Sequence, residues 1–178
     1  MRESLRMILV LTVIAMVSGI VLTQLYEFTS PIIAENRAER MESGVYAVLE
    51  DVESVEFIDA DFVMFRALDG DGNSIGFAYA GEGSGYAGPV RVLVGVDHET
   101  KEVTGITILE HTETPGLGTQ VEEEDFRSQF VGKSPEDTIE ISTDIDNITG
   151  ATQSAAAVAQ AVRVNLSEAI SIYEGGDY

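Results

Sequence analysis

The sequence predicts an α+β protein in which one N-terminal transmembrane helix precedes an antiparallel-sheet domain with flanking helices. Residues 7–26 form an apolar run without a single Asp, Glu, Lys or Arg. Further along, segments rich in β-branched residues are separated by short turn sequences, which favours hairpins. From Ser154 to Tyr173, apolar residues recur at intervals of three and four, which is typical of a core-facing helix. Hairpins with helices at both ends of the chain predict the α+β class.

The apolar run "MILVLTVIAMVSGIVLTQLY" is long enough to cross a membrane. As a helix it would extend about 30 Å, the thickness of the hydrocarbon core of a bilayer. A cleaved signal peptide is the alternative, but its apolar region usually spans about 7–15 residues and ends at a small-x-small site. No convincing Ala-x-Ala sequence follows here, so we expect a retained single-pass anchor over residues 7–26.

The charges around this anchor predict its orientation. Arg2 and Arg6 precede the apolar run, and only Glu3 opposes them. Because positive charge tends to stay on the cytoplasmic side, we expect residues 1–6 in the cytoplasm and residues 27–178 outside it. The protein would then be located in the cell membrane. The run carries no carboxylate of the kind that lines ion paths, so any ion translocation is expected to belong to partner proteins.

The chain is strongly acidic. It has 10 Lys and Arg against 31 Asp and Glu, a formal net charge of −21. Without Arg2, Arg6 and Glu3, 8 basic and 30 acidic residues are left, a formal charge of −22. Such a domain would repel nucleic acid and anionic lipid headgroups, so we expect no nucleic-acid partner. The absence of cysteine excludes disulfides, thiolate metal sites and iron–sulfur clusters.

Two regions follow the anchor: a juxtamembrane helical linker over residues 27–55 and an extracytoplasmic domain over residues 56–178. Pro31 marks the point at which a helix continues or restarts beyond the membrane. The helical stripe in the linker is only partial, because Arg37 and Arg40 interrupt its apolar members, which are Ile33, Met41, Val45 and Val48.

The domain is expected to contain two hairpins, a late strand and a final helix. The segments "EFIDADFVMFRAL" and "SIGFAYAGEG" flank the turn sequence "DGDGN". The segments "PVRVLVGVD" and "EVTGITILEH" flank a second turn, "HETK". We also expect a short strand at "TIEIST". The final helix should bury one stripe of residues, namely Val158, Val162, Leu166, Ala169 and Tyr173.

The sequence "DGDGN" begins like a calcium-binding loop, with Asp69, Asp71 and Asn73 at alternate positions. A calcium loop needs glycine at its sixth position and glutamate at its twelfth, and these positions hold Ser74 and Ala80. Because Asp, Gly and Asn are also turn formers, a hairpin turn is the better interpretation.

Two other patterns do not have the context that their usual function requires. Gly83, Gly85 and Gly88 form a G-x-G-x-x-G sequence, but a strand follows it where a dinucleotide site needs a helix. These glycines instead favour a close backbone approach, to a flat ligand or within a turn. His98 and His111 are far apart and have no carboxylate cluster beside them, so we expect no metal site.

The loop "HTETPGLGTQ", residues 111–120, is the first candidate for a binding segment. Pro115, Gly116 and Gly118 favour a sharp loop with exposed backbone. Short polar side chains precede the apolar Leu117. A planar ligand with polar edges and an apolar face would fit this arrangement, and so would an ordinary exposed turn.

The second candidate is "DNITGATQS", residues 146–154, where the final helix is expected to begin near Gly150 or Ala151. The first N–H groups of a helix have no partners within the helix and favour a phosphate. Small residues would let a phosphate approach, and the Thr152 hydroxyl could be esterified by it. The plain alternative is that Asp146 and Thr149 cap the helix.

Together, the two stretches resemble the FMN-binding domain family. The sequence "DNITGAT" is similar to the family's D-x-x-[S/T]-G-A-T, at which a flavin transferase attaches FMN through its phosphate to the final threonine. "HTETPGLG" resembles the H-x-E-T-P-G-L-G loop, and "GYAGPVRVLVGVD" resembles the strand before it. The likeness covers essentially the whole chain, including the anchor.

The resemblance implies a role for each matching residue. Thr152 would be the covalent FMN attachment point, within a modification sequence that includes Asp146 and Gly150. Thr114 and Leu117 would contact the isoalloxazine ring, with Glu113 supporting them. Thr149, where the family more often has serine, and Ala151 complete the cofactor-binding set.

The resemblance is closest to the G subunits of Rnf complexes, which are ion-translocating ferredoxin:NAD+ oxidoreductases. It implies an electron-carrying subunit without independent turnover, whose partners are the other membrane and redox subunits and the flavin transferase. The alternatives are the C subunit of the Na+-translocating NADH:quinone reductase, a flavin domain that serves another reductase, and a non-redox acidic surface module.

Overall fold

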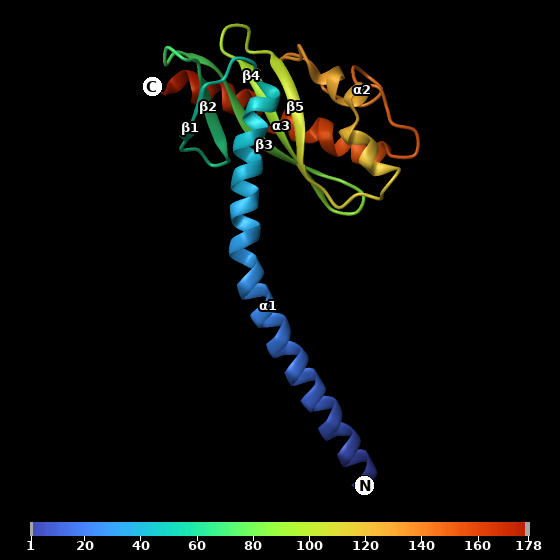
Figure 1. Ribbon diagram of the computed structural model, residues 1–178. Helices are drawn as coiled ribbons and strands as arrows, with labels where there is room; N and C mark the ends of the chain where they lie inside the picture. The colour runs from blue at the N-terminus through green and yellow to red at the C-terminus, as the bar shows by residue number, and fades with distance from the viewer. Residues whose placement is uncertain (1, 177–178) are drawn as a thin grey trace. The chain divides into compact units, whose positions relative to one another are not determined.

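The computed structural model describes residues 2–176 and confirms the predicted class (Figure 1). A long N-terminal helix is followed by a five-stranded antiparallel sheet and by further helices. The elements are α1 (Arg2–Val48), β1 (Ser54–Ile58), β2 (Met64–Leu68), β3 (Ser74–Ser84), β4 (Pro89–Asp97), β5 (Val103–Glu110), the 3-10 helices η1 (Gly118–Glu122) and η2 (Ser128–Phe130), α2 (Glu124–Arg127) and α3 (Thr152–Gly175). The chain divides into two compact units, Met1–Glu39 and Arg40–Tyr178.

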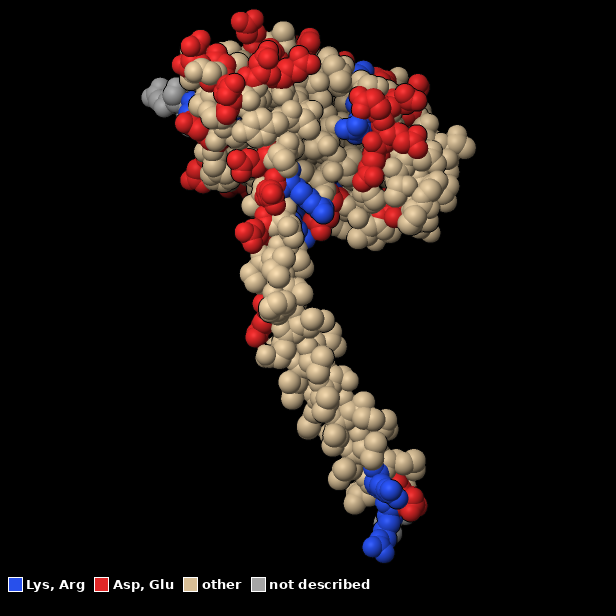
Figure 2. Space-filling view, in the orientation of Figure 1, with Lys and Arg blue, Asp and Glu red and all other residues tan. Residues whose placement is uncertain are grey.

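In the first unit, α1 exposes its apolar side chains along its length. Among residues 2–176 it is the one helix long and apolar enough to cross a membrane. The helix continues through Pro31. The hydroxyls of Thr12 and Thr23 donate hydrogen bonds to carbonyls four residues earlier, which satisfies these polar groups within the helix. In Figure 2 the helix surface is mostly uncharged, and its basic side chains gather at the N-terminal end and near the domain.

The sheet has the strand order β1-β2-β3-β4-β5, and every neighbouring pair is antiparallel. Both predicted hairpins are confirmed. In the β2–β3 turn, the Asp69 carboxylate accepts hydrogen bonds from the backbone N–H groups of Asp71 and Asn73 at 2.9 and 2.8 Å. These hydrogen bonds, chiefly that from the Asn73 backbone, hold the pKa of Asp69 below its ordinary value.

Two details of the predicted strands are wrong. The segment "EFIDADFVMFRAL" is divided between β1 and β2, because the chain turns at residues 59–63. The segment "TIEIST" makes only an isolated bridge between Ile141 and Ile145. Here the Asp144 carboxylate accepts hydrogen bonds from the backbone N–H groups of Ile139 and Glu140 at 2.9 and 2.7 Å, which closes a compact turn. Ile139 has a φ of 46°, which is incompatible with an extended strand.

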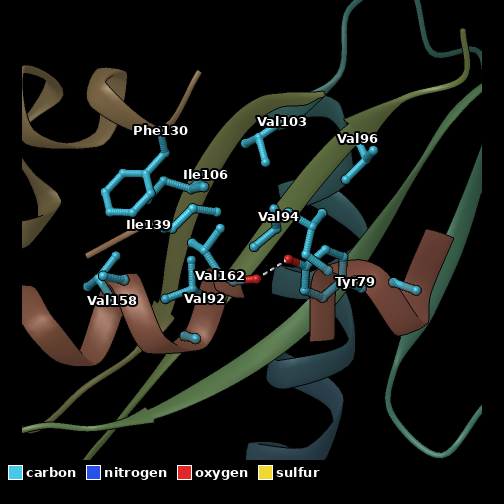
Figure 3. Packing of buried hydrophobic residues seen from close by; sticks show 14 of the residues in the cluster. Tyr79, Val92, Val94, Val96, Val103, Ile106, Phe130, Ile139, Val158 and Val162 are labelled. Carbon is cyan, nitrogen blue, oxygen red and sulfur yellow. Dashed lines mark hydrogen bonds between the residues drawn. The ribbon is translucent and has the colours of Figure 1, made fainter. Parts of the chain in front are cut away.

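The main core lies between the sheet and α3, whose predicted stripe is buried in full. Figure 3 shows valines of β4 packed against Val158 and Val162 of α3. The Tyr79 hydroxyl, also buried here, donates a hydrogen bond to the carbonyl of Val162. Burial raises the pKa of Tyr79 far above its ordinary value. The core therefore fixes where α3 lies on the sheet.

The opposite face of the sheet is covered within the second unit by the end of α1. Val45, Val48 and Leu49 pack there against Leu93 of β4. The Thr104 hydroxyl donates a hydrogen bond of 2.5 Å to the carbonyl of Val48. Of the partial stripe predicted for the linker, Val45 and Val48 are buried, whereas Ile33, Arg37 and Arg40 are exposed. The central strands are thus covered on both faces.

Two glycines of β3 set the distance between the sheet and α3. A Cβ atom added at Gly83 would lie 1.9 Å from the carbonyl oxygen of Ala157, and one at Gly81 would lie 2.0 Å from that of Ala161. Glycine is required here because the helix backbone rests directly on the strand.

We expect Gly83→Ala to lower the free energy of unfolding by about 1–3 kcal/mol, because the methyl group would overlap the helix backbone. Gly175→Ala is the matched control, since nothing lies within 4 Å of a Cβ atom there. Chemical denaturation of the full chain in detergent would measure both. Equal stability of the two variants would contradict this account of helix placement.

Candidate functional site

A pocket of about 640 Å³ opens at the N-terminal end of α3. Three segments that are distant in sequence form it: the β3–β4 connection, the loop after β5 and the residues at the start of α3. Its lining residues are Tyr86, Glu113, Thr114, Leu117, Gly118, Gly150, Ala151, Thr152, Gln153 and Ser154. The volume lies within the range that is usual for small-molecule and cofactor sites.

The loop after β5 presents Leu117 to the pocket through a tight turn. The carbonyl of Thr114 accepts hydrogen bonds from the N–H groups of Leu117 and Gly118 at 3.2 and 3.0 Å. Gly116 adopts a φ of 77°, which glycine takes without strain. The Leu117 side chain is 48% exposed, so a large apolar group stands free at the pocket wall. Such a group can pack against the face of a flat ligand.

The segment before α3 is anchored at several points. Ile145 is buried in the core, and the N–H of Asp146 donates a hydrogen bond of 2.6 Å to Oε1 of Gln129. Gly150 then turns the chain with a φ of 84°. The N–H of Ala151 donates to the carbonyl of Ile148 at 3.0 Å. The start of α3 is therefore held in a defined position.

The helix begins at Thr152, one or two residues after the predicted start. The prediction that Asp146 or Thr149 caps it is wrong, because the cap position is Ala151 and no side chain accepts a hydrogen bond there. The free N–H groups of the first turn carry partial positive charge. The cap residue has only a methyl side chain and the first residues of the helix line the pocket, so this end of the helix favours an anion such as phosphate.

Glu113 joins the three segments from inside the pocket wall. Its side chain is almost fully buried, at 5% exposure. Its Oε2 accepts a hydrogen bond of 2.6 Å from the hydroxyl of Ser154, in the first turn of α3, and its Oε1 accepts one of 3.1 Å from the N–H of Ala87. The nearby helix N-terminus also stabilises a carboxylate. Glu113 thus supports the pocket and has little surface to offer a ligand.

The structure brings six of the predicted site residues together in the pocket lining: Glu113, Thr114, Leu117, Gly150, Ala151 and Thr152. Asp146 and Thr149 are not among the lining residues of the pocket. Sequence reasoning missed Tyr86, Gly118, Gln153 and Ser154 as lining residues. The sequence marks the segment around Tyr86 by its glycines. It gives no signal that the Tyr86 side chain lines the pocket and is 73% exposed.

The two histidines have separate structural partners. Nε2 of His111 lies 3.0 Å from Oε1 of Glu122, and its Nδ1 accepts a hydrogen bond from the N–H of Glu113. Nδ1 of His98 lies 2.7 Å from the hydroxyl of Tyr173, near the other end of α3. Within residues 2–176, no group of three or more His, Asp or Glu side chains is arranged to hold a metal ion.

Known proteins resemble the chain along most of its length. A family model described as FMN-binding domain matches residues 85–167, a range that includes every lining residue of the pocket. The G subunit of the proton-translocating ferredoxin:NAD(+) oxidoreductase complex of Clostridium ljungdahlii is 28% identical over 172 residues, covering 93% of this chain and 91% of that protein. The G subunit of the ion-translocating oxidoreductase complex of Methanosarcina acetivorans is 27% identical over 185 residues, covering 98% of each.

A solved structure shares the fold. The C subunit of the Na(+)-translocating NADH-quinone reductase from Parabacteroides distasonis superimposes with a TM-score of 0.60 at 18% sequence identity. The match covers 80% of this chain and 94% of that one.

We expect Ser154→Ala to lower the free energy of unfolding by about 1–3 kcal/mol, because it removes a hydroxyl donor from a buried carboxylate oxygen. Ser167→Ala, at an exposed position of the same helix, should stay within about 0.5 kcal/mol of the wild type. Thermal or chemical unfolding would compare them. If Ser154→Ala were as mild as its control, Glu113 would not join the pocket segments as described.

Proposed function

We propose that the chain belongs to the FMN-binding domain family, that its pocket holds FMN and that it is an electron-carrying subunit of a membrane-bound, ion-translocating ferredoxin:NAD+ oxidoreductase complex. The observation that carries this proposal is the convergence of residues 113–118 and 150–154 on one pocket. These are the two segments whose sequences match the family's loop and modification sequence.

The choice of complex follows from the extent of the likeness. The two G subunits match this chain over more than nine tenths of its length, including the N-terminal helix. The chain would therefore be a redox subunit without independent turnover, and its partners would be the other membrane and redox subunits. The similarity to the C subunit of a quinone reductase, at 18% identity, supports the common fold.

The residues of the pocket fit FMN by their chemistry. Leu117 offers an apolar surface to the ring system, and Thr114 offers a hydroxyl and backbone groups beside it. Gly150, Ala151 and the first turn of α3 would receive the phosphate, because small side chains leave the free N–H groups accessible. FMN, when bound, supplies the transfer of electrons, while the protein supplies binding, orientation and electrostatics.

We propose further that the attachment is a phosphoester to the Thr152 hydroxyl, installed by a flavin transferase. Residues 27–178, which follow the anchor, carry a formal charge of −22, which would repel a free phosphate-bearing cofactor. Outside the cell, a cofactor that dissociates would also be lost. A covalent bond removes both problems, and Thr152 is the hydroxyl residue that stands at the helix start and lines the pocket.

The proposed arrangement places residues 1–6 in the cytoplasm, residues 7–26 in the membrane, residues 27–55 in a linker and residues 56–178 on the extracytoplasmic side. The uncharged run within α1 and the arginines before it support this arrangement. The flavin would then relay electrons along the outer side of the membrane, between centres that belong to partner proteins of the complex.

We expect Thr152→Ala to abolish covalent flavin when the full chain is produced together with its flavin transferase. Wild-type protein should fluoresce in a denaturing gel under ultraviolet light and show the added mass of FMN less one water. Thr152→Ser keeps the hydroxyl and serves as the matched control, so it should retain some of the modification. Stoichiometric FMN on Thr152→Ala after dialysis, or an unmodified wild-type chain, would reject the covalent attachment.

The orientation can be tested with single cysteines, because the natural chain has none. In right-side-out vesicles, a membrane-impermeant maleimide should label Ser171→Cys, which lies at an exposed position of α3. Glu3→Cys should react only after the vesicles are opened. The reverse pattern would place the domain in the cytoplasm.

A further inference from the structure

The position that follows Asp146 contacts the proposed attachment residue. The modification sequence leaves this position open, and here it holds Asn147. In the structure, Nδ2 of Asn147 donates a hydrogen bond of 2.9 Å to Oγ1 of Thr152. This contact joins the two ends of the turn that leads into α3.

The hydrogen bond restricts a side chain that would otherwise change rotamer. Thr152 is exposed at the first position of the helix, where threonine populates more than one χ1 rotamer. A threonine oxygen has two lone pairs and one hydrogen. Accepting the Asn147 hydrogen uses one lone pair, so the second lone pair and the O–H group are left for chemistry.

Asn147 itself extends from a rigid segment. The core residue Ile145 lies two positions before it, and the Asp146 N–H is bound to the Gln129 side chain at 2.6 Å. After it, the Ile148 carbonyl accepts the Ala151 N–H. The backbone on both sides of Asn147 is therefore held in place, and so is the position from which its side-chain amide extends.

We propose that Asn147 is a positioning residue for covalent flavin attachment, because it holds Oγ1 of Thr152 at the mouth of the pocket in one orientation. This inference rests on the proposed function. In the reaction, Oγ1 forms a bond to the FMN phosphorus of a flavin dinucleotide, and the pyrophosphate P–O bond breaks. The nucleoside monophosphate leaves with the electron pair, and the hydroxyl proton passes to a base on the transferase. No atom is oxidised or reduced.

A positioning role and a purely structural role differ in kinetics. A positioning residue acts on the attack of Oγ1, so its loss lowers kcat for modification. A residue that only shapes the surface recognised by the transferase changes KM for the chain. A third role, in which the hydrogen bond sequesters the hydroxyl, predicts that its removal speeds the reaction.

The experiment uses the detergent-solubilised full chain, purified flavin transferase and excess flavin adenine dinucleotide. Initial rates of in-gel fluorescence are measured against the concentration of the chain. We expect Asn147→Ala to lower kcat about tenfold, with KM within about twofold of the wild type, because one orienting hydrogen bond is lost. Asn147→Asp, which is matched in size, should lose more, since its charge faces the incoming phosphate. Asn165→Ala, which lies in α3 far from the attachment residue, should match the wild type.

Thermal unfolding of each variant shows whether it is folded. Should Asn147→Ala unfold, Asn147→Leu, which is similar in size and has neither a donor nor a charge, carries the kinetic comparison. Wild-type kcat or faster modification in Asn147→Ala, a loss confined to KM, or a loss seen only in Asn147→Asp would each overturn the positioning role while leaving the attachment at Thr152 intact. A wild-type chain that takes no flavin would instead overturn the proposed function and this inference with it.

Discussion

The pocket depends on one buried carboxylate whose two oxygens each have a fixed donor. Glu113 joins the loop after β5 to Ser154 in α3 and to Ala87 in the β3–β4 connection. Burying a charge is costly unless hydrogen bonds and local dipoles compensate it. Here the hydroxyl, the backbone N–H and the N-terminus of α3 provide this compensation. Because all three segments meet at Glu113, the positions of Leu117 and Thr152 follow from it.

The placement of α3 is the second constraint on the site. Gly81 and Gly83 let the helix backbone rest directly on β3, and the stripe that includes Val158 and Val162 buries its inner face. These contacts lie along the helix body, whereas the pocket lies at its first turn. The core thus fixes the direction of the helix and its distance from the sheet. The N-terminal turn of the helix takes no part in these contacts and is available to bind an anion.

The electrostatics of the domain differ between its surface as a whole and the pocket. Figure 2 shows acidic side chains over much of the visible face, and many of the basic residues are paired with carboxylates. Such a surface repels a phosphate at a distance. At short range, the uncapped start of α3 attracts it. The net charge of the domain and the start of α3 thus act on a phosphate in opposite directions.

Local patterns in the sequence determined the apolar run of α1, the two hairpin turns, the buried stripe of α3 and the two segments that line the pocket. Each of these depends on residues close together in the chain. Tertiary structure alone decided that Glu113 reaches Ser154, 41 positions later, and that Tyr86 stands at the same pocket. Residues 138–143 form no strand for a local reason, because the nearby Asp144 side chain takes backbone donors that a strand would use. Hydrogen bonds between distant segments leave no periodicity in the sequence, and for that reason only the folded chain reveals them.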